Sequence, residues 1–135
     1  MESDFYKVLV CGSRDIRDWK FVFNKLDFLL SKKDLSSVVL IHGDQKSFDK
    51  HLEIYHGADY FAKLWAKERN VKQIPFPADW DNFGKSAGPI RNKQLVNENP
   101  DACVGFLGRN SKNSGTKNML KLCEDKGIPI KKYYI

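Results

Sequence analysis

The chain has 135 residues, of which 41% are hydrophobic and 30% are charged, a composition that is typical of one globular domain and excludes a disordered tail. No apolar run approaches the ~20 residues that a bilayer span requires, which argues against a membrane partner. The 23 basic and 17 acidic residues give a net charge of +6, which permits phosphate-bearing partners without demanding them. The basic residues are spread along the chain, which argues against a nucleic-acid-binding arm. We therefore expect a single domain over residues 1–135.

The cysteines and the first residues predict the compartment. Cys11, Cys103 and Cys123 show no CxxC spacing, which argues against both a disulfide framework and a zinc module. Residues 1–4 are acidic where a secretory signal would be basic. These features predict a reducing, cytoplasmic location. The spacing of the three histidines matches no zinc pattern, so we predict no metal site.

Five short apolar runs predict five strands. They occupy residues 5–11, 37–41, 71–76, 102–106 and 128–133. Most are nearly continuous in hydrophobic residues, which is typical of parallel strands covered on both faces. The last run contains Lys131 and Lys132 and indicates an edge strand.

Two helical patterns lie in the first half of the chain. Apolar residues recur at three- and four-residue spacing from Trp19 to Leu30, with Asp18 as the predicted N-cap. A second apolar stripe with the same spacing runs from Ala58 to Trp65. Both stripes predict amphipathic helices that cover the sheet.

A third and a fourth helix follow in the second half. Pro89 suits the first turn of a helix that ends before Pro100. Met119 and Cys123 mark the fourth helix, and Gly127 is predicted to end it.

The segment between the second strand and the second helix predicts a further short element. Phe48, Leu52 and Tyr55 are spaced i, i+4, i+7, which indicates a short amphipathic helix that acts as a lid or a contact surface.

The alternation of strands and helices predicts an α/β fold with a doubly wound, five-stranded parallel sheet between two helical layers. The expected strand order is 3-2-1-4-5, counted along the chain. In that order the switch point lies between the first and the fourth strand, and ligands bind outside the carboxyl ends of the strands there. The loops after these two strands should therefore face each other across one crevice.

The loop after the fourth strand is expected to bind an anion. Residues 108–116 are rich in small residues and lead into a helix, whose first N–H groups and positive dipole end suit a phosphate. The order of residues is not that of a Walker loop. An alternative is that Ser114 and Thr116 only cap the helix.

The loop after the first strand, Gly12-Ser13-Arg14, combines a turn glycine, a hydroxyl group and a guanidinium group suited to phosphate. It lacks the GxGxxG fingerprint of nicotinamide-dinucleotide binding, and we predict no cofactor. An exposed Arg14 paired with Asp15 or Asp18 is the alternative.

The long loop at residues 76–92 is expected to be functional because compact domains rarely keep such loops without a role. It offers Trp80 and Phe83 for stacking on a base or sugar, together with Asp79, Lys85 and Arg91. Alternatively, the two aromatic side chains only plug the end of the sheet.

These motifs, taken together, resemble a known family over nearly the whole chain. They are residues 12–15, 42–43, 57–59 with Ala62, Trp65 and Ala66, 76–80, 84–85, 87–92, 100–101, 114–116 with Met119, and 127–129. The chain resembles the YspA-type (cpYpsA-related) branch of the SLOG superfamily, which includes the DprA/Smf proteins and the LOG phosphoribohydrolases.

The resemblance implies a Rossmann-like domain whose pocket accepts a nucleotide or a nucleotide-derived ligand. The family's pocket motifs map onto Ser13, Arg14, Gly57, Asp59, Lys85, Arg91, Asn92, Gly115 and Thr116. Gly12, Trp80 and Ser114 join this candidate site from the loops described above. SLOG relatives often form homo-oligomers, so the resemblance also implies a second copy as a partner.

Two departures from the family pattern bear on function. Residues 44–56 extend a loop that is usually compact, which leaves ligand shape and oligomer contacts open. In LOG enzymes a catalytic glutamate follows the glycine-threonine pair, whereas this chain has Met119 at that position. A methionine cannot supply a carboxylate, which argues against LOG-type hydrolysis.

Three functions remain as hypotheses. The first is a sensor or sequestering module for a nucleotide-derived small molecule. The second is a hydrolase or transferase acting on an N-glycosidic or phosphoester bond, with Asp79 or Asp59 as the catalytic carboxylate. The third is single-stranded nucleic-acid binding, which the scattered positive charge disfavours.

Overall fold

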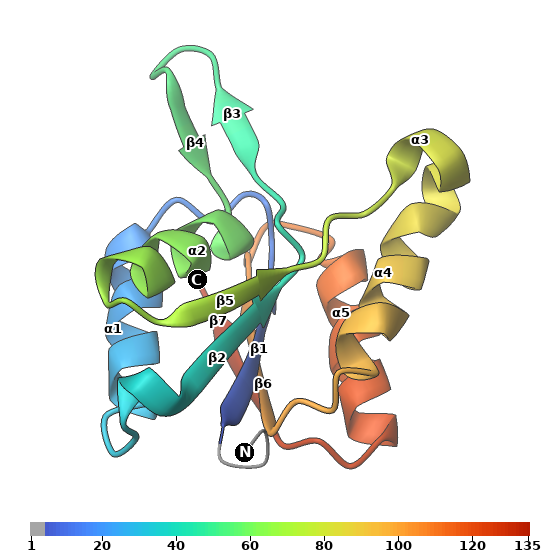
Figure 1. Ribbon diagram of the computed structural model, residues 1–135. Helices are drawn as coiled ribbons and strands as arrows, with labels where there is room; N and C mark the ends of the chain where they lie inside the picture. The colour runs from blue at the N-terminus through green and yellow to red at the C-terminus, as the bar shows by residue number, and fades with distance from the viewer. Residues whose placement is uncertain (1–4) are drawn as a thin grey trace.

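A five-stranded parallel sheet forms the centre of the protein, as the computed structural model of residues 5–135 shows (Figure 1). Its strands are β1 (Tyr6–Gly12), β2 (Val38–His42), β5 (Lys72–Pro75), β6 (Ala102–Leu107) and β7 (Ile130–Tyr134). Their order in the sheet is β5-β2-β1-β6-β7, and all four neighbouring pairs are parallel. Counted along the chain this order is 3-2-1-4-5, which confirms the predicted sheet and places β7 at an edge. The acidic residues 1–4 lie outside the described part of the chain.

Helices cover both faces of the sheet and complete three layers (Figure 1). One face carries α1 (Trp19–Leu29) and α2 (Ala58–Glu68), and the other carries α4 (Ala87–Val96) and α5 (Ser114–Asp125). Because successive strand residues point to opposite faces, Val8 and Val10 of β1 pack under α1 and α2, whereas Leu9 and Cys11 pack under α4 and α5. The two hydrophobic cores confirm the Rossmann-like α/β/α arrangement.

The predicted ends of the helices agree with the structure. The Asp18 carboxylate accepts a hydrogen bond of 3.1 Å from the Phe21 N–H and caps α1, as expected. Gly127, with a φ of 77°, follows the end of α5 and supplies the left-handed backbone that ends it. Among residues 5–135, no helix combines the length and the apolar character that crossing a membrane requires.

The helix predicted around Phe48, Leu52 and Tyr55 is wrong, because this segment forms a hairpin of β3 (Ser47–Asp49) and β4 (Ile54–His56). Phe48 lies opposite Tyr55 in the register, with ring centroids 5.0 Å apart. The Asp49 carboxylate accepts hydrogen bonds from the N–H groups of His51 and Leu52, which stabilises the turn. The apolar spacing that suggested a helical face therefore also suits a cross-strand pair.

Short helical turns interrupt the connections. They are the 3₁₀ turns η2 (Leu35–Ser37) and η3 (Gly84–Ser86) and the single-turn helix α3 (Trp80–Phe83). The last two fold residues 80–86 of the predicted loop 76–92 into a compact arm at the N-terminal end of α4 (Figure 1), and residues 87–92 belong to α4 itself. This arm places Trp80 against Gly88, where a Cβ would lie 3.4 Å from the indole ring.

Candidate functional site

A cavity of about 650 Å³ opens at the carboxyl edge of the sheet, where the loops after β1 and β6 meet. Further walls come from α3, α4 and the first turn of α5. Its lining residues are Val10, Cys11, Gly12, Ser13, Arg14, Asp15, Gly43, Gln45, Asp59, Trp80, Lys85, Gly88, Pro89, Arg91, Asn92, Leu95, Ser111, Lys112, Asn113, Ser114, Gly115, Thr116, Asn118 and Met119. The convergence of the two loops at one crevice is therefore confirmed.

Hydrogen bonds join the two loops directly. The hydroxyl oxygens of Ser13 and Ser111 lie 3.3 Å apart, and the Ser111 hydroxyl donates to the Asp15 carboxylate at 2.7 Å. At the base of this contact, the Ser13 N–H donates to the Phe106 carbonyl at 2.9 Å. Gly12 allows the close approach, since a Cβ there would collide with the Ala58 side chain and lie 2.6 Å from the Phe106 carbonyl oxygen.

Arg14 extends over the mouth of the cavity. Its Nε donates to Gln45 Oε1 at 2.7 Å, and its guanidinium carbon lies 5.7 Å from the centroid of the Trp80 ring. The His56 Nδ1–H donates to the Arg14 carbonyl at 2.7 Å, and Gly57, with a φ of 118°, packs against the same backbone. The guanidinium thus bonds Gln45 and not the aspartates that the sequence offered as partners.

The first turn of α5 has no side-chain cap. Asn113 occupies the N-cap position with a left-handed φ of 57°, but its amide group bonds Gly108 and Ser111. The alternative that Ser114 and Thr116 cap this helix is wrong, because both lie inside it. The first N–H groups of α5 therefore meet the cavity without a side-chain partner, an arrangement that suits an anion.

A buried pair of opposite charges forms the inner wall. Asp59 Oδ2 accepts a hydrogen bond of 3.3 Å from the Gln45 N–H, and Oδ1 is buried without a partner. Burial raises the pKa of the Asp59 carboxyl, although the nearby charges of His42 and Arg91 oppose the shift. Burial also lowers the pKa of Arg91 below its ordinary value. Gly43 separates the two, because a Cβ there would collide with the Arg91 guanidinium.

Arg91 and Asn92 connect this wall to α5. The Arg91 guanidinium donates to the Gly43 carbonyl at 2.8 Å and to Asn92 Oδ1 at 3.0 Å. The Asn92 amide donates in turn to Asn118 Oδ1 at 2.9 Å and to the Gly115 carbonyl at 3.2 Å. The position of the α5 N-terminus is therefore set by side chains of α4.

Comparison with known proteins identifies the family. Residues 6–83 match the family described as "YspA, cpYpsA-related SLOG family" (YAcAr). The chain belongs to this family. The SLOG-family chain is also 32% identical over 130 residues to the Gene 61 protein of Mycobacterium phage D29, a match that covers 92% of this chain and 93% of that relative. Family membership agrees with a nucleotide-related role in binding or processing and specifies no ligand.

The structure of this SLOG-family protein brings together most of the predicted site residues. Gly12, Ser13, Arg14, Asp59, Trp80, Lys85, Arg91, Asn92, Ser114, Gly115 and Thr116 all line the cavity. Gly57 and Asp79 are not among its lining residues. Gly57 supports the Arg14 backbone, and the Asp79 carboxylate caps α3 by accepting hydrogen bonds from the Asn82 backbone and side chain at 3.2 and 2.7 Å.

Several lining residues were not predicted. Asn118 lies four residues after Ser114, so helical spacing alone places the two on one face of α5. No pattern in the sequence indicated that Gln45 lines the cavity, because this residue belongs to the segment 44–56, where a short helix was predicted in place of the hairpin. Met119 also lies in the cavity lining, with 1% of its surface exposed.

Proposed function

We propose that this SLOG-family protein binds a nucleotide or a nucleotide-derived small molecule in this cavity, as a sensor or sequestering module. The observation that carries the proposal is the uncapped N-terminus of α5, which opens into the same cavity as the Arg14 guanidinium. N–H groups at a helix N-terminus and an arginine fork together suit a phosphate group.

The balance of charge in the cavity lining supports a phosphate ligand. Arg14, Lys85, Arg91 and Lys112 contribute positive charge to the lining, against the carboxyl groups of Asp15 and Asp59. Because burial raises the pKa of Asp59, this group opposes a bound anion less than an ordinary carboxylate would.

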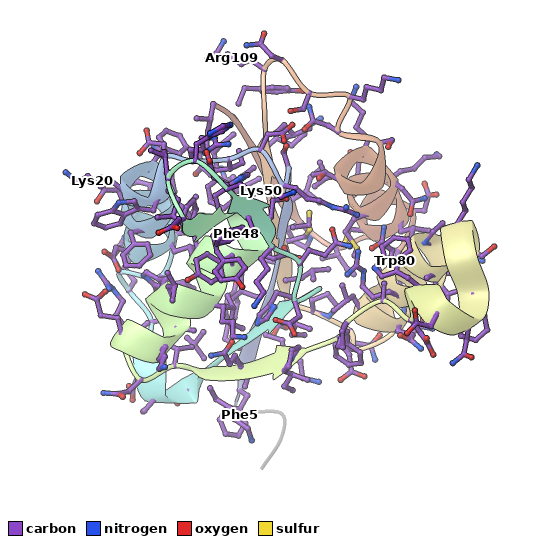
Figure 2. All side chains as sticks on the ribbon, turned by 90° about the horizontal axis from the view of Figure 1, so that it is seen from above. Phe5, Lys20, Phe48, Lys50, Trp80 and Arg109 are labelled. Carbon is purple, nitrogen blue, oxygen red and sulfur yellow. The ribbon has the colours of Figure 1, made fainter. Side chains whose placement is uncertain are left out.

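Trp80 offers a contact for the base of a nucleotide ligand. Trp80, labelled in Figure 2, is 45% exposed, lies over Gly88 and reaches the cavity from α3. A half-exposed indole beside a phosphate site offers a stacking surface for a base. We include a cytoplasmic location in the proposal, because the three cysteines of the chain are free thiols.

Calorimetry tests the proposal with purified protein and a panel of NAD, ADP-ribose, cyclic nucleotides and nucleoside monophosphates. We expect at least one member to bind, and Arg14→Gln to weaken it by about 10- to 100-fold, since a charge-assisted hydrogen bond contributes roughly 1.5–3 kcal/mol. Arg109→Gln is the matched control, because Arg109 is exposed on the loop after β6 and does not line the cavity. Absence of binding across the panel, or equal losses in both variants, would refute the proposal.

Asp59 supports a second candidate function, hydrolysis or transfer at the N-glycosidic or phosphoester bond of a nucleotide. A carboxyl group whose pKa is raised by burial holds its proton to a higher pH than an ordinary carboxyl group does, a direction that suits the role of general acid toward a leaving group. Chromatography of each nucleotide after incubation tests this, with Asp59→Asn expected to abolish turnover while binding persists. Binding without any product in the unmodified protein would leave the sensor function as the better account.

A further inference from the structure

A second concave surface lies on the far side of the β3–β4 hairpin from the long arm. It is a groove of about 790 Å³ between the hairpin and the helices α1 and α2. Its lining residues are Arg17, Trp19, Phe23, Glu53, Ile54, Tyr55, His56, Tyr60, Phe61, Leu64, Lys67 and Glu68. All three residues of β4 belong to this lining, so the strand itself forms one wall of the groove.

Aromatic rings run in an unbroken series from the hairpin into the groove. The ring of Phe48 lies 5.0 Å from that of Tyr55, Tyr55 lies 5.7 Å from Tyr60, and Tyr60 lies 5.8 Å from Phe61. Figure 2 shows Phe48 above α2, where the hairpin projects over the helix. The hairpin and the groove therefore form one continuous apolar surface.

The exposed area on this surface is in the range of a weak protein–protein interface. The side chains that remain open to solvent are Trp19 at 46%, Phe48 at 50%, Leu52 at 64%, Ile54 at 46% and Tyr55 at 42%. With each side chain still exposing about 100 Å², the patch offers about 500 Å² per chain, or about 1,000 Å² when two copies face each other. That total reaches the lower limit for a specific protein–protein interface, and about 500 Å² per chain is the size of the largest apolar patch of an ordinary monomer, a patch that is often functional.

The backbone of β4 indicates what covers the patch. In the two-stranded sheet, β4 pairs with β3 along one edge, and among residues 5–135 no strand pairs with its other edge. An unpaired edge beside an exposed apolar face is a template for another strand. Because Tyr55 is the middle residue of β4, a two-fold axis beside it would align the strand antiparallel with its own copy.

We propose that two copies of this chain form a dimer in which the β4 strands pair antiparallel, giving a four-stranded ribbon of order β3-β4-β4-β3. Each hairpin then covers the groove of the other copy. The charged residues of the groove lining balance, with Arg17 and Lys67 beside Glu53 and Glu68, so the groove carries no net charge that would repel a second copy. A self-complementary edge makes a second copy a better occupant than an unrelated peptide.

Analytical ultracentrifugation tests the proposal on the full-length protein. At about 100 μM chain we expect twice the monomer mass of 15.6 kDa. The double variant Leu52→Glu, Ile54→Glu should weaken the dimer by at least about tenfold, since it places charge in the interface core. Phe28→Glu is the matched control, because Phe28 is 70% exposed on α1 and does not line the groove. Circular dichroism verifies that both variants fold.

A cross-link tests the register independently. The three native cysteines are buried. Tyr55→Cys therefore adds the one accessible thiol among residues 5–135, and it lies beside the proposed two-fold axis. Mild oxidation should convert this variant to a covalent dimer, whereas Phe28→Cys should remain monomeric under the same conditions. Each of three results would overturn the proposal. They are a monomer at 100 μM, a dimer whose affinity is unchanged in the double variant, and equal cross-linking of Tyr55→Cys and Phe28→Cys.

Discussion

The cavity and the groove are built in opposite ways. Polar groups line the cavity and bond one another, so that Ser13 meets Ser111 and Asn92 meets Asn118. The groove is lined by aromatic rings, and its hairpin wall projects from the body of the protein (Figure 1). The cavity thus suits a small polar ligand, whereas the groove suits contact with a second protein surface.

His56 connects these two regions. It lines the groove at the end of β4, and its Nδ1–H donates to the carbonyl of Arg14, which extends over the cavity. Gln45, just before β3, binds the Arg14 side chain. Both ends of the hairpin therefore hold Arg14, so changes in the groove should reach the cavity through this residue.

The largest expected effect follows from closing the space at Gly12. In Gly12→Ala, the new Cβ meets the Ala58 side chain and the Phe106 carbonyl oxygen, and a backbone group cannot give way as a flexible side chain does. We expect the free energy of unfolding to fall by about 3 kcal/mol, the upper range for overpacking. Urea denaturation measures it, and a loss below about 1 kcal/mol would show that the contact of β1 with α2 adjusts easily.

Gly115→Ala tests the same cavity without strain. No atom lies within 4 Å of a Cβ at Gly115, and alanine favours a helix, so stability should stay equal or rise by about 0.5 kcal/mol. The methyl group would nevertheless occupy the space where a phosphate approaches α5, and affinity for the ligand should fall about tenfold. Calorimetry beside urea denaturation separates the two effects. Unchanged affinity would place the phosphate elsewhere in the cavity.

Topology explains why the cavity could be predicted from the sequence. Apolar runs predict the parallel strands, and strand order then decides which loops meet, so the sequence predicts that Ser13, Arg14 and Thr116 lie together. The hairpin could not be predicted in this way. Phe48 and Tyr55 are seven residues apart, which suits two helical turns as well as two strands joined by a turn. The turn depends on the left-handed backbone of Glu53, which no sequence rule demands, and on the Asp49 carboxylate, which accepts hydrogen bonds from the His51 and Leu52 N–H groups.

Individual contacts in the site were also beyond prediction. Asp79 was expected to face the ligand, but a carboxylate just before a helix competes for its N–H groups, and this one caps α3. Asp59 and Asp79 look alike in the sequence, and burial alone distinguishes them.

Asp59 predicts how stability depends on pH. Burial raises the pKa of its carboxyl above the ordinary 3.8, so the folded protein holds the proton to higher pH than the unfolded chain does. Its contribution to stability is fully present below pH 3.8 and is lost as the pH rises through the folded-state pKa. Asn does not titrate, so Asp59→Asn should gain stability relative to the unmodified protein as the pH rises, by at most about 1.4 kcal/mol per pH unit. A difference in free energy of unfolding between the two proteins that is the same at every pH would contradict this prediction.

His56 tests the connection between groove and cavity. His56→Leu removes the donor to the Arg14 carbonyl, which should cost about 1 kcal/mol of stability and weaken ligand binding several-fold by releasing Arg14. His56→Asn keeps an N–H donor near the same position and should restore most of the affinity. Equal affinities in both variants would show that the hairpin does not position Arg14.

The smallest effect is expected at the tip of the hairpin. Leu52 is 64% exposed, so Leu52→Ser should change the free energy of unfolding by no more than about 0.5 kcal/mol when measured at a concentration where the protein is monomeric. At high concentration the same variant should lose additional stability, because association stabilises the folded chain by mass action. Urea denaturation at two protein concentrations makes the comparison. If the two proteins differ in free energy of unfolding by the same amount at both concentrations, Leu52 contributes only within its own chain. That result would count against a second copy on the groove, and the groove would no longer differ from the cavity in the kind of partner it binds.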